Sequence, residues 1–466
     1  MNKNYDLSFL SESKINDILK MSENKASDKA EVKRIIEKAK LAKGLTPEES
    51  AILLNIKDPE MLEEMFKAAR SVKEKIYGKR IVMFAPLYIS NYCVNSCKYC
   101  GYKHENDELC RKKLNKEELI SEVKALEKLG HKRIALEAGE DPINCSLDYV
   151  LECIKNIYSI KFDNGNIRRI NVNIAATTVE NYKRLKAADI GTYILFQETF
   201  HKPTYEKVHL KGPKKDYDYH TTAMFRAREA EIDDIGIGVL YGLYDYKYET
   251  IAMILYADAL EKVTGVGPHT ISVPRLRVAE NVTLEDYPHI VPDDEFKKVV
   301  AVLRLAVPYT GLILSTREEI ELRDEIIALG VSQVSSGSCT GVGGYSESAG
   351  KTNQFEVGDR RSPMEMLASL IKSGYVPSYC TACYRQGRTG DRFMEFAKSG
   401  TINVFCEANA LMTLKEFLLD YADEDLRKLG DETILKTLEN MHDEEFKEKI
   451  RGYLKRIEAG ERDLRV

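Results

Sequence analysis

A chain of 466 residues is long enough for one large barrel with an appended domain, or for two to three average domains. Its formal net charge of −5, from 69 basic and 74 acidic residues, argues against nucleic acid as a partner because phosphate binding normally needs a basic surface. The N-terminus has no apolar signal region, and no stretch reaches the roughly 18 apolar residues of a membrane span, so we expect a cytoplasmic protein with no membrane partner. Thiols stay reduced in that compartment, so the ten cysteines are expected to be metal ligands or buried thiols.

Residues 1–80 mix charged and apolar residues at helical spacing and predict an N-terminal helical extension. Thr46 is a plausible N-cap, with Pro47 at the first helical position. No motif in this segment indicates chemistry.

From 81 to 344, eight short β-rich runs alternate with helical segments. The first connecting helix is marked by Asn115 as N-cap, by Glu118 three residues later and by Gly130 at its end. Eight strand–helix repeats over about 260 residues predict an α/β fold, a TIM-type (β/α)8 barrel, with a doubly wound open sheet as the alternative. The expected strands are Ile81–Ile89, Arg133–Ala138, Arg169–Ala175, Thr192–Gln197, Ile235–Tyr241, Thr270–Pro274, Gly311–Ser315 and Val331–Ser335.

Three cysteines follow the first expected strand with the spacing C-x3-C-x2-C, at Cys93, Cys97 and Cys100. Three thiolates from one loop can hold three irons of a cubane iron–sulfur cluster, which leaves one iron open to a small molecule. The alternative is zinc, which prefers four protein ligands and could take Cys110 as the fourth. The x3-then-x2 spacing is unlike the paired C-x2-C halves of usual zinc sites and favours the cluster.

Polar residues follow several expected strands, where a barrel of this kind carries its chemistry. Glu198 follows the fourth strand and could accept hydrogen bonds from a ribose or an amino group, whereas His201 and His209 have no spaced partner and are expected on the surface. Arg275 follows the sixth strand and Arg317 the seventh, and two guanidiniums at neighbouring strand ends suit a small carboxylate. Either arginine alone could be a structural salt-bridge partner, but together they suggest an amino-acid substrate.

Residues 345–466 are expected to form a mostly helical C-terminal domain, joined to the barrel by the glycine-rich segment 335–344. This segment could cradle an anion through its backbone amides, or serve only as a flexible connection. Cys380, Cys383 and Cys406 give the spacing C-x2-C-x22-C, again three ligands without an obvious fourth. A zinc knuckle is the alternative and would need another thiolate or histidine nearby, so a second iron–sulfur cluster fits better.

The C-x3-C-x2-C loop, with Tyr99 before its last cysteine, resembles the signature of radical S-adenosylmethionine (SAM) enzymes. In that superfamily the open iron of a 4Fe-4S cluster chelates SAM, and one electron cleaves it to methionine and a 5′-deoxyadenosyl radical. Ala138, Gly139 and Glu140 resemble the Gly-Gly-Glu element that meets the methionine amino group of SAM, with alanine in place of the first glycine. With Tyr99 and Glu198 they make up the expected cofactor-binding set, although Glu140 could instead be a solvated loop carboxylate.

Segments 197–205, 274–277 and 314–318 resemble the tyrosine-lyase branch of this superfamily, which contains 2-iminoacetate synthase and the FeFe-hydrogenase maturases of the HydG type. The C-x2-C-x22-C tail is similar to that of the maturases and is not part of the synthase pattern. The resemblance therefore implies a lyase that cleaves the Cα–Cβ bond of L-tyrosine to p-cresol and dehydroglycine, and then forms carbon monoxide and cyanide for maturation of the hydrogenase H-cluster. A 2-iminoacetate synthase that stops at dehydroglycine is the nearest alternative, and a noncatalytic iron–sulfur carrier is another.

The same resemblance assigns ligands and partners. The first three cysteines hold the SAM-binding 4Fe-4S cluster, and the second three hold an auxiliary 4Fe-4S cluster with an additional labile iron, to which His269 is the protein ligand. The expected partners are L-tyrosine, a reducing electron donor of the flavodoxin or ferredoxin type, and other hydrogenase maturation proteins. The expected catalytic residues are Arg275, Thr316 and Arg317.

The sixth expected strand separates the two predicted sites. His269 opens this strand and Arg275 ends it, so at about 3.3 Å per residue they lie roughly 20 Å apart, at opposite ends of the barrel. We therefore expect SAM and tyrosine at one end, the second cluster at the other end under the C-terminal domain, and a passage between them. Two clusters on one face would contradict this arrangement.

Overall fold

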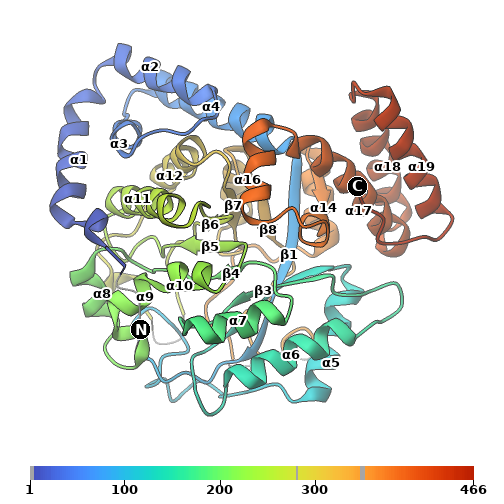
Figure 1. The fold of residues 1–466 in the computed structure, drawn as a ribbon, viewed down its shortest axis with the longest axis horizontal. Helices are drawn as coiled ribbons and strands as arrows, with labels where there is room; N and C mark the ends of the chain where they lie inside the picture. Colours follow the sequence, from blue (N-terminus) through green and yellow to red (C-terminus); the bar gives the residue numbers. More distant parts are fainter. Residues whose placement is uncertain (1–4, 280–281, 347–351) are drawn as a thin grey trace.

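The computed structural model describes residues 5–279, 282–346 and 352–466, and its centre is a closed barrel of eight parallel strands (Figure 1). Neighbouring strands follow one another in chain order, and β1 closes the ring by pairing with both β8 and β2. The predicted TIM-type barrel is confirmed, and the open sheet is wrong. The barrel strands are β1 (Arg80–Ser90), β2 (Arg133–Ala138), β3 (Arg169–Asn173), β4 (Tyr193–Ile194), β5 (Ile235–Gly238), β6 (Thr270–Ser272), β7 (Gly311–Leu314) and β8 (Gln333–Ser335).

Strand β1 is the longest strand because it serves three neighbours in succession. Its residues Ala85–Tyr88 and Ser90 pair with β2, and Val82–Phe84 pair with β8. Its first three residues, Arg80–Val82, pair with a ninth strand, β9 (Val376–Ser378), which comes from the C-terminal segment. The apolar run of β1 is buried along most of its length, as expected for a strand covered on both faces.

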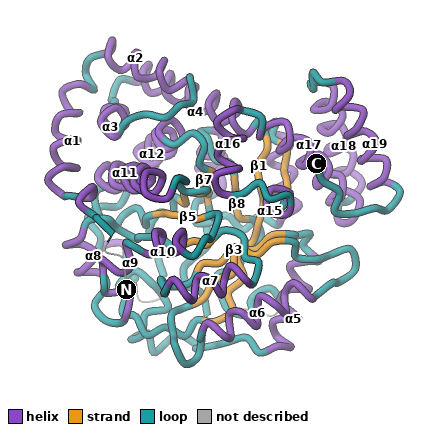
Figure 2. Tube along the Cα trace, viewed as in Figure 1, coloured by secondary structure: helices purple, strands orange, loops and turns teal. Residues whose placement is uncertain are grey.

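Helices surround the barrel on its outer side (Figure 2). The helix after β1 begins at Asn115 with the expected capping box to Glu118, and ends before Gly130, whose φ of +85° suits a residue without a side chain. The helices of the barrel are α5 (Lys116–Lys128), α6 (Leu147–Ser159), α7 (Val179–Ala187), α8 (Lys202–Val208), α9 (Tyr217–Thr221), α10 (Ala223–Glu229), α11 (Tyr246–Thr264), α12 (Asp293–Ala306) and α13 (Ile320–Ala328), with short 3-10 turns at Pro213–Lys215 and Leu284–Asp286.

The N-terminal residues form a helical layer against the barrel helices α11 and α12. Thr46 caps its third helix with a capping box to Glu49, and Pro47 occupies the first helical position as predicted. This layer consists of a 3-10 turn (Ser8–Leu10), α1 (Glu12–Lys25), α2 (Lys29–Lys40), α3 (Pro47–Leu54) and α4 (Pro59–Tyr77).

The C-terminal residues are mostly helical, as expected, but β9 ties them to the barrel sheet. Helix α17 packs on β9 and on α4, so the segment that carries Cys406 lies over the amino ends of the barrel strands. Figure 1 shows α18 and α19 on the outer side of α17, away from the barrel. The helices are α14 (Pro363–Lys372), α15 (Ala382–Arg385), α16 (Gly390–Ser399), α17 (Ile402–Tyr421), α18 (Glu424–Glu439) and α19 (Glu444–Glu458). None of the helices in the described ranges is both long and apolar enough to cross a membrane.

Candidate functional site

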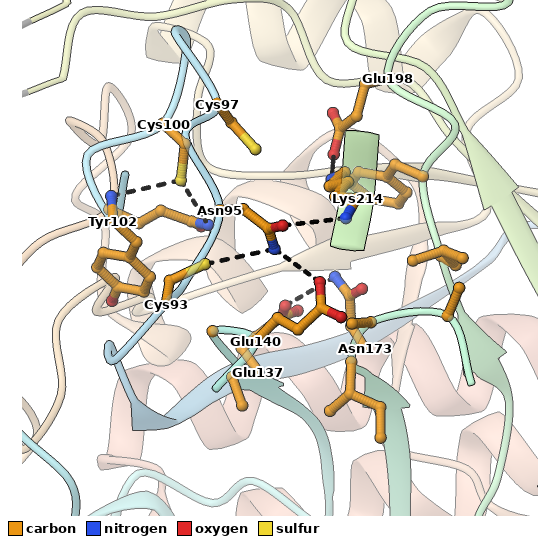
Figure 3. Close-up of a pocket in the computed structure, with 18 of the residues that line it drawn as sticks. Cys93, Asn95, Cys97, Cys100, Tyr102, Glu137, Glu140, Asn173, Glu198 and Lys214 are labelled. Atoms are coloured by element: carbon orange, nitrogen blue, oxygen red, sulfur yellow. Dashed lines mark hydrogen bonds and ion pairs between the residues drawn. The ribbon is translucent and has the colours of Figure 1, made fainter. Parts of the chain in front are cut away.

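A cavity of about 160 Å³ opens at the carboxyl ends of the barrel strands, and we call it the upper cavity. All three cysteines of the first motif line it, and in Figure 3 their sulfur atoms face a common space. The expected cofactor-binding residues lie in the same wall: Tyr99, Ala138, Gly139, Glu140 and Glu198. The structure thus brings together residues that are separated by up to 105 positions in the chain.

The cysteine loop is held in place by pairing with a second segment. Residues 94–98 run antiparallel to 208–212, with a bridge between Cys97 and His209 and a hydrogen bond of 2.9 Å from the Lys98 backbone N–H to the Val208 carbonyl oxygen. His209 is fully buried, and its Nε2 lies 2.8 Å from the Tyr99 hydroxyl. The expectation that His201 and His209 lie on the surface is wrong, because both are buried by aromatic side chains that pack against them.

Asn95, inside the cysteine motif, connects three parts of the upper cavity (Figure 3). Its Nδ2 donates to the Glu140 carboxylate at 2.6 Å and lies 3.7 Å from the Cys93 sulfur, and its Oδ1 accepts the backbone N–H of Lys214 at 3.0 Å. Gln354 donates to the sulfur of Cys100 at 3.6 Å. The sequence did not predict a role for Asn95 or Gln354. Neither residue belongs to a recognisable spacing pattern, and only the fold brings their side chains to the cysteines.

These contacts fit an iron–sulfur cluster on the three thiolates. Burial raises the pKa of Cys100 to about 11, so cluster binding has to displace a proton, and N–H donors aimed at the sulfurs favour the thiolate that remains. Cys110 is exposed and does not line the upper cavity, so it is wrong as a fourth ligand for zinc. Among the described residues, no three His, Cys, Asp or Glu side chains are grouped closely enough for a single metal ion. The thiolates that hold a cubane surround four irons, so they need not converge on one ion.

Two carboxylates of the upper cavity are fixed in different ways. Burial raises the pKa of Glu140, and the hydrogen bond from Asn95 opposes this shift. Glu198 forms an ion pair of 2.7 Å with Lys214 and has a φ of +69°, a strained value for a residue with a side chain. Glu198 follows β4 at the mouth of the barrel, so the strain is located at the cavity wall.

A second cavity of about 110 Å³ lies deeper in the barrel, and we call it the inner cavity. Thr316 lines it, and six residues line both this cavity and the upper one: Glu137, Asn173, Phe196, Arg317, Gln354 and Phe355. The upper and inner cavities therefore adjoin each other.

Arg317 presents an unpaired cation to both cavities. No carboxylate of the described residues pairs with its guanidinium, which stacks on the ring of Phe355 at 3.4 Å, and burial lowers its pKa. A buried cation without a counterion favours an anionic ligand. Glu137, in the same wall, accepts from Asn173 at 2.7 Å, and burial raises its pKa to about 8.

Arg275 and Arg317 do not line a common cavity. The prediction that their guanidiniums bind one carboxylate together is therefore wrong. The guanidinium of Arg275 contacts the buried carboxylate of Glu318 and pairs with Asp293 at 2.8 Å, and it lines neither the upper nor the inner cavity. The side chains of the two arginines leave neighbouring strand ends in different directions. Arg275 is therefore a structural ion-pair partner.

At the opposite end of the barrel, a third cavity holds the second cysteine motif, and we call it the lower cavity. Cys380, Cys383, Cys406 and His269 all line it. Four of the barrel residues around it are the first residues of their strands: Arg80, Arg133, Gly311 and Gln333. The two cysteine motifs thus lie at opposite ends of the barrel.

The lower cavity carries an excess of positive charge on its barrel side. Arg80 and Arg133 line it without an acidic partner in the described part of the chain, and Arg133 donates to the Tyr384 hydroxyl at 2.9 Å. The pKa of Cys406 is lowered, first by its hydrogen bond with Cys383 and further by the charge of Arg80. Cations at this position offset the negative charge of three thiolates, which fits a cluster held by cysteines.

The inner and lower cavities follow one another along the barrel axis. Val82 of β1, Gly311 of β7 and Gln333 of β8 line the lower cavity. The residues two positions further along each strand line the inner cavity: Phe84, Ile313 and Ser335. Because residues two apart in a strand point to the same side, the two cavities are consecutive layers of one barrel interior.

Comparison with known proteins agrees with this geometry. Residues 87–255 match the Radical SAM superfamily, and residues 272–376 match the Biotin and Thiamin Synthesis associated domain. The 2-iminoacetate synthase of Salmonella typhimurium is 29% identical over 343 residues, which are 73% of this chain and 89% of that protein. A crystal structure of HydG, a maturase of the FeFe-hydrogenase, is 60% identical and covers 98% of this chain and 100% of its own, with a TM-score of 0.96. The HydG structure from Carboxydothermus hydrogenoformans is 42% identical, covering 95% of this chain and 97% of its own, with a TM-score of 0.83.

A cysteine triad at the mouth of a TIM-type barrel and a matching superfamily domain define a radical SAM enzyme, which uses a 4Fe-4S cluster and SAM. Within that class, the chain belongs to the HydG family of FeFe-hydrogenase maturases, whose solved members match it from end to end.

Proposed function

We propose that this protein is a tyrosine lyase that also produces carbon monoxide and cyanide for FeFe-hydrogenase maturation. The observation that carries the proposal is the lower cavity, where Cys380, Cys383, Cys406 and His269 meet. A protein that stops at dehydroglycine has no use for a second cluster site. The 29% identical 2-iminoacetate synthase aligns with 73% of this chain, which supports a first reaction step in the barrel that is common to both proteins.

In the upper cavity, we propose that Cys93, Cys97 and Cys100 hold the 4Fe-4S cluster, which supplies the electron that cleaves SAM. Glu140, held by Asn95, accepts a hydrogen bond from the amino group of SAM. The other residues proposed to bind SAM are Tyr99, Ala138, Gly139 and Glu198.

In the inner cavity, Arg317 anchors the carboxylate of L-tyrosine, with Thr316 beside it. Its planar guanidinium can donate two parallel hydrogen bonds to a carboxylate. This places the amino acid against the residues shared with the upper cavity, next to SAM. Arg275 has no part in this contact.

In the lower cavity, we propose that the three cysteines hold an auxiliary 4Fe-4S cluster and that His269 binds an additional labile iron. The passage from tyrosine to this cluster would follow the barrel axis, through the layer between Val82 and Phe84. We propose the division into residues 1–80, 81–344 and 345–466 as extension, barrel and auxiliary-cluster domain, with β9 reaching back from the third to the second. A flavodoxin- or ferredoxin-type donor and other maturation proteins are the proposed partners, and the cytoplasmic location stays a prediction.

The test is product analysis on the reconstituted wild-type protein. With tyrosine, SAM and dithionite under anaerobic conditions, we expect p-cresol, 5′-deoxyadenosine and CO, the last measured by its binding to haemoglobin. Release of p-cresol without CO would support the 2-iminoacetate synthase alternative. Iron binding without 5′-deoxyadenosine would support a noncatalytic carrier.

A further inference from the structure

Next to His269, which lines the lower cavity, lies a carboxylate that the proposed function does not yet use. Asp234 lies directly before β5 and is 3% exposed, and its Oδ1 lies 3.5 Å from Nδ1 of His269. Neither Asp234 Oδ2 nor His269 Nδ1 has a hydrogen-bond partner, although both are buried. A buried donor and a buried acceptor that lack partners in adjacent side chains favour a hydrogen bond between the imidazole Nδ1 and the carboxylate.

The backbone of His269 is fixed, so only its ring can adjust. Its N–H donates to the Ile235 carbonyl at 2.8 Å, and its own carbonyl accepts from Gly311 at 2.9 Å, which holds the residue between β5 and β7. The ring packs edge-on against Phe393 of α16, with a centroid distance of 4.4 Å. With Nδ1 turned toward Asp234, the other ring nitrogen, Nε2, is the one available to the cavity that holds the cysteines.

Asp234 is itself held by the C-terminal domain. Its Oδ1 accepts the backbone N–H of Gly390, the first residue of α16, at 3.0 Å. The N-terminus of a helix offers unpaired backbone N–H groups to an acceptor, so this contact holds the carboxylate in place. Asp234 thereby connects the barrel residue His269 to the domain that supplies the three cysteines.

We propose that Asp234 is the positioning residue of His269: its carboxylate accepts the Nδ1 proton, fixes the tautomer and aims the Nε2 lone pair at a metal ion beside the three cysteines. A histidine that binds a metal usually donates its other ring N–H to a carboxylate or a carbonyl in this way, and loss of that partner typically lowers metal affinity about 10- to 100-fold. This inference rests on the proposed function, because it assumes that the lower cavity binds iron outside the cubane.

The adjacent residue offers a matched control. Asp233 is exposed, and its Oδ2 accepts from the Thr389 hydroxyl at 3.2 Å, so it joins the same two segments without contacting His269. Asp234→Ala and Asp233→Ala each remove one hydrogen bond between the barrel and the start of the α16 segment. Asp234→Asn keeps the shape of the side chain and removes its charge.

The experiment measures Fe²⁺ binding to reconstituted full-length protein after its loosely bound iron has been removed with a chelator. We expect Asp234→Ala to raise the half-saturation concentration for one Fe²⁺ per chain by about 10- to 100-fold, with Asp234→Asn in between and Asp233→Ala unchanged. The electron paramagnetic resonance spectrum of the Asp234→Ala protein should approach that of His269→Ala, and p-cresol formation should stay at the wild-type rate.

Wild-type Fe²⁺ affinity in both Asp234→Asn and Asp234→Ala would overturn the inference. An equal loss of Fe²⁺ affinity in Asp233→Ala would also overturn it, because Asp234 would then act only as a link between the barrel and the C-terminal domain. Folding is checked by circular dichroism; if Asp234→Ala fails to fold, Asp234→Asn decides alone. Failure of the proposed function has a different signature, because the wild type and His269→Ala would then bind the same amount of iron and the wild type would release no CO.

Discussion

Replacing Cys406 with alanine is expected to abolish CO and cyanide formation while p-cresol continues to be released at close to the wild-type rate. Cys406 lies on α17 and lines the lower cavity, and none of the described residues lines both the lower and the upper cavity. A cubane that loses one of three cysteine ligands is not held, whereas the SAM site keeps all of its contacts. The measurement is the ratio of CO to p-cresol, by haemoglobin binding and by liquid chromatography.

Cys153→Ala is the matched control, because Cys153 is buried in α6 and lines neither the upper nor the lower cavity. It removes the same atoms from a buried site, so it reports any general cost of losing a thiol. We expect both products to be retained in this variant. Loss of p-cresol together with CO in Cys406→Ala, but not in Cys153→Ala, would contradict separate sites.

Replacing Arg317 with glutamine is expected to lower kcat/KM for tyrosine by roughly 30- to 5,000-fold, because loss of one partner from a buried charge pair costs about 2–5 kcal/mol. The guanidinium stacks on Phe355 and has no acidic partner among the described residues, so its charge is available to the carboxylate of a substrate. Cleavage of SAM without tyrosine, measured on the same protein, separates the loss of substrate binding from damage to the cluster or to the upper cavity, which Arg317 also lines.

Arg277→Gln is the control for Arg317. Arg277 follows β6, the strand next to β7, and pairs with Glu318 at 3.1 Å. It lines neither the upper nor the inner cavity, and Glu318 keeps its contact with Arg275. We expect wild-type kinetics in this variant. An Arg317→Gln protein with an unchanged kcat/KM would show that the substrate carboxylate is bound elsewhere.

The barrel could be predicted because its parallel strands are buried, and each buried strand appears in the sequence as a short apolar run. All eight expected runs overlap a strand of the structure, although several strands end earlier than expected, such as β4, which is only Tyr193–Ile194. Strand β9 was missed. Its sequence, Val376-Pro377-Ser378, has no periodicity, and it becomes a strand only because the start of β1 offers it an open edge.

The candidate site was predictable where spacing carries information. Two cysteine motifs and their positions before or after strands led to two sites at opposite ends of the barrel, as the structure has them. Contacts between residues that are far apart in the sequence could not be predicted from spacing. The choice between Arg275 and Arg317 depends on whether Glu318 neutralises one of them, and the role of Asp234 depends on a turn that meets α16 from another domain.

The most direct test of two separate clusters is an iron and sulfide count on anaerobically reconstituted protein, for the wild type and for a variant with Cys380, Cys383 and Cys406 all replaced by alanine. Two cubanes with an additional iron predict about eight to nine irons per chain for the wild type and about four for the triple variant, which should still cleave SAM. Equal iron and sulfide contents in the two proteins would contradict the second cluster, and with it the proposed origin of CO and cyanide.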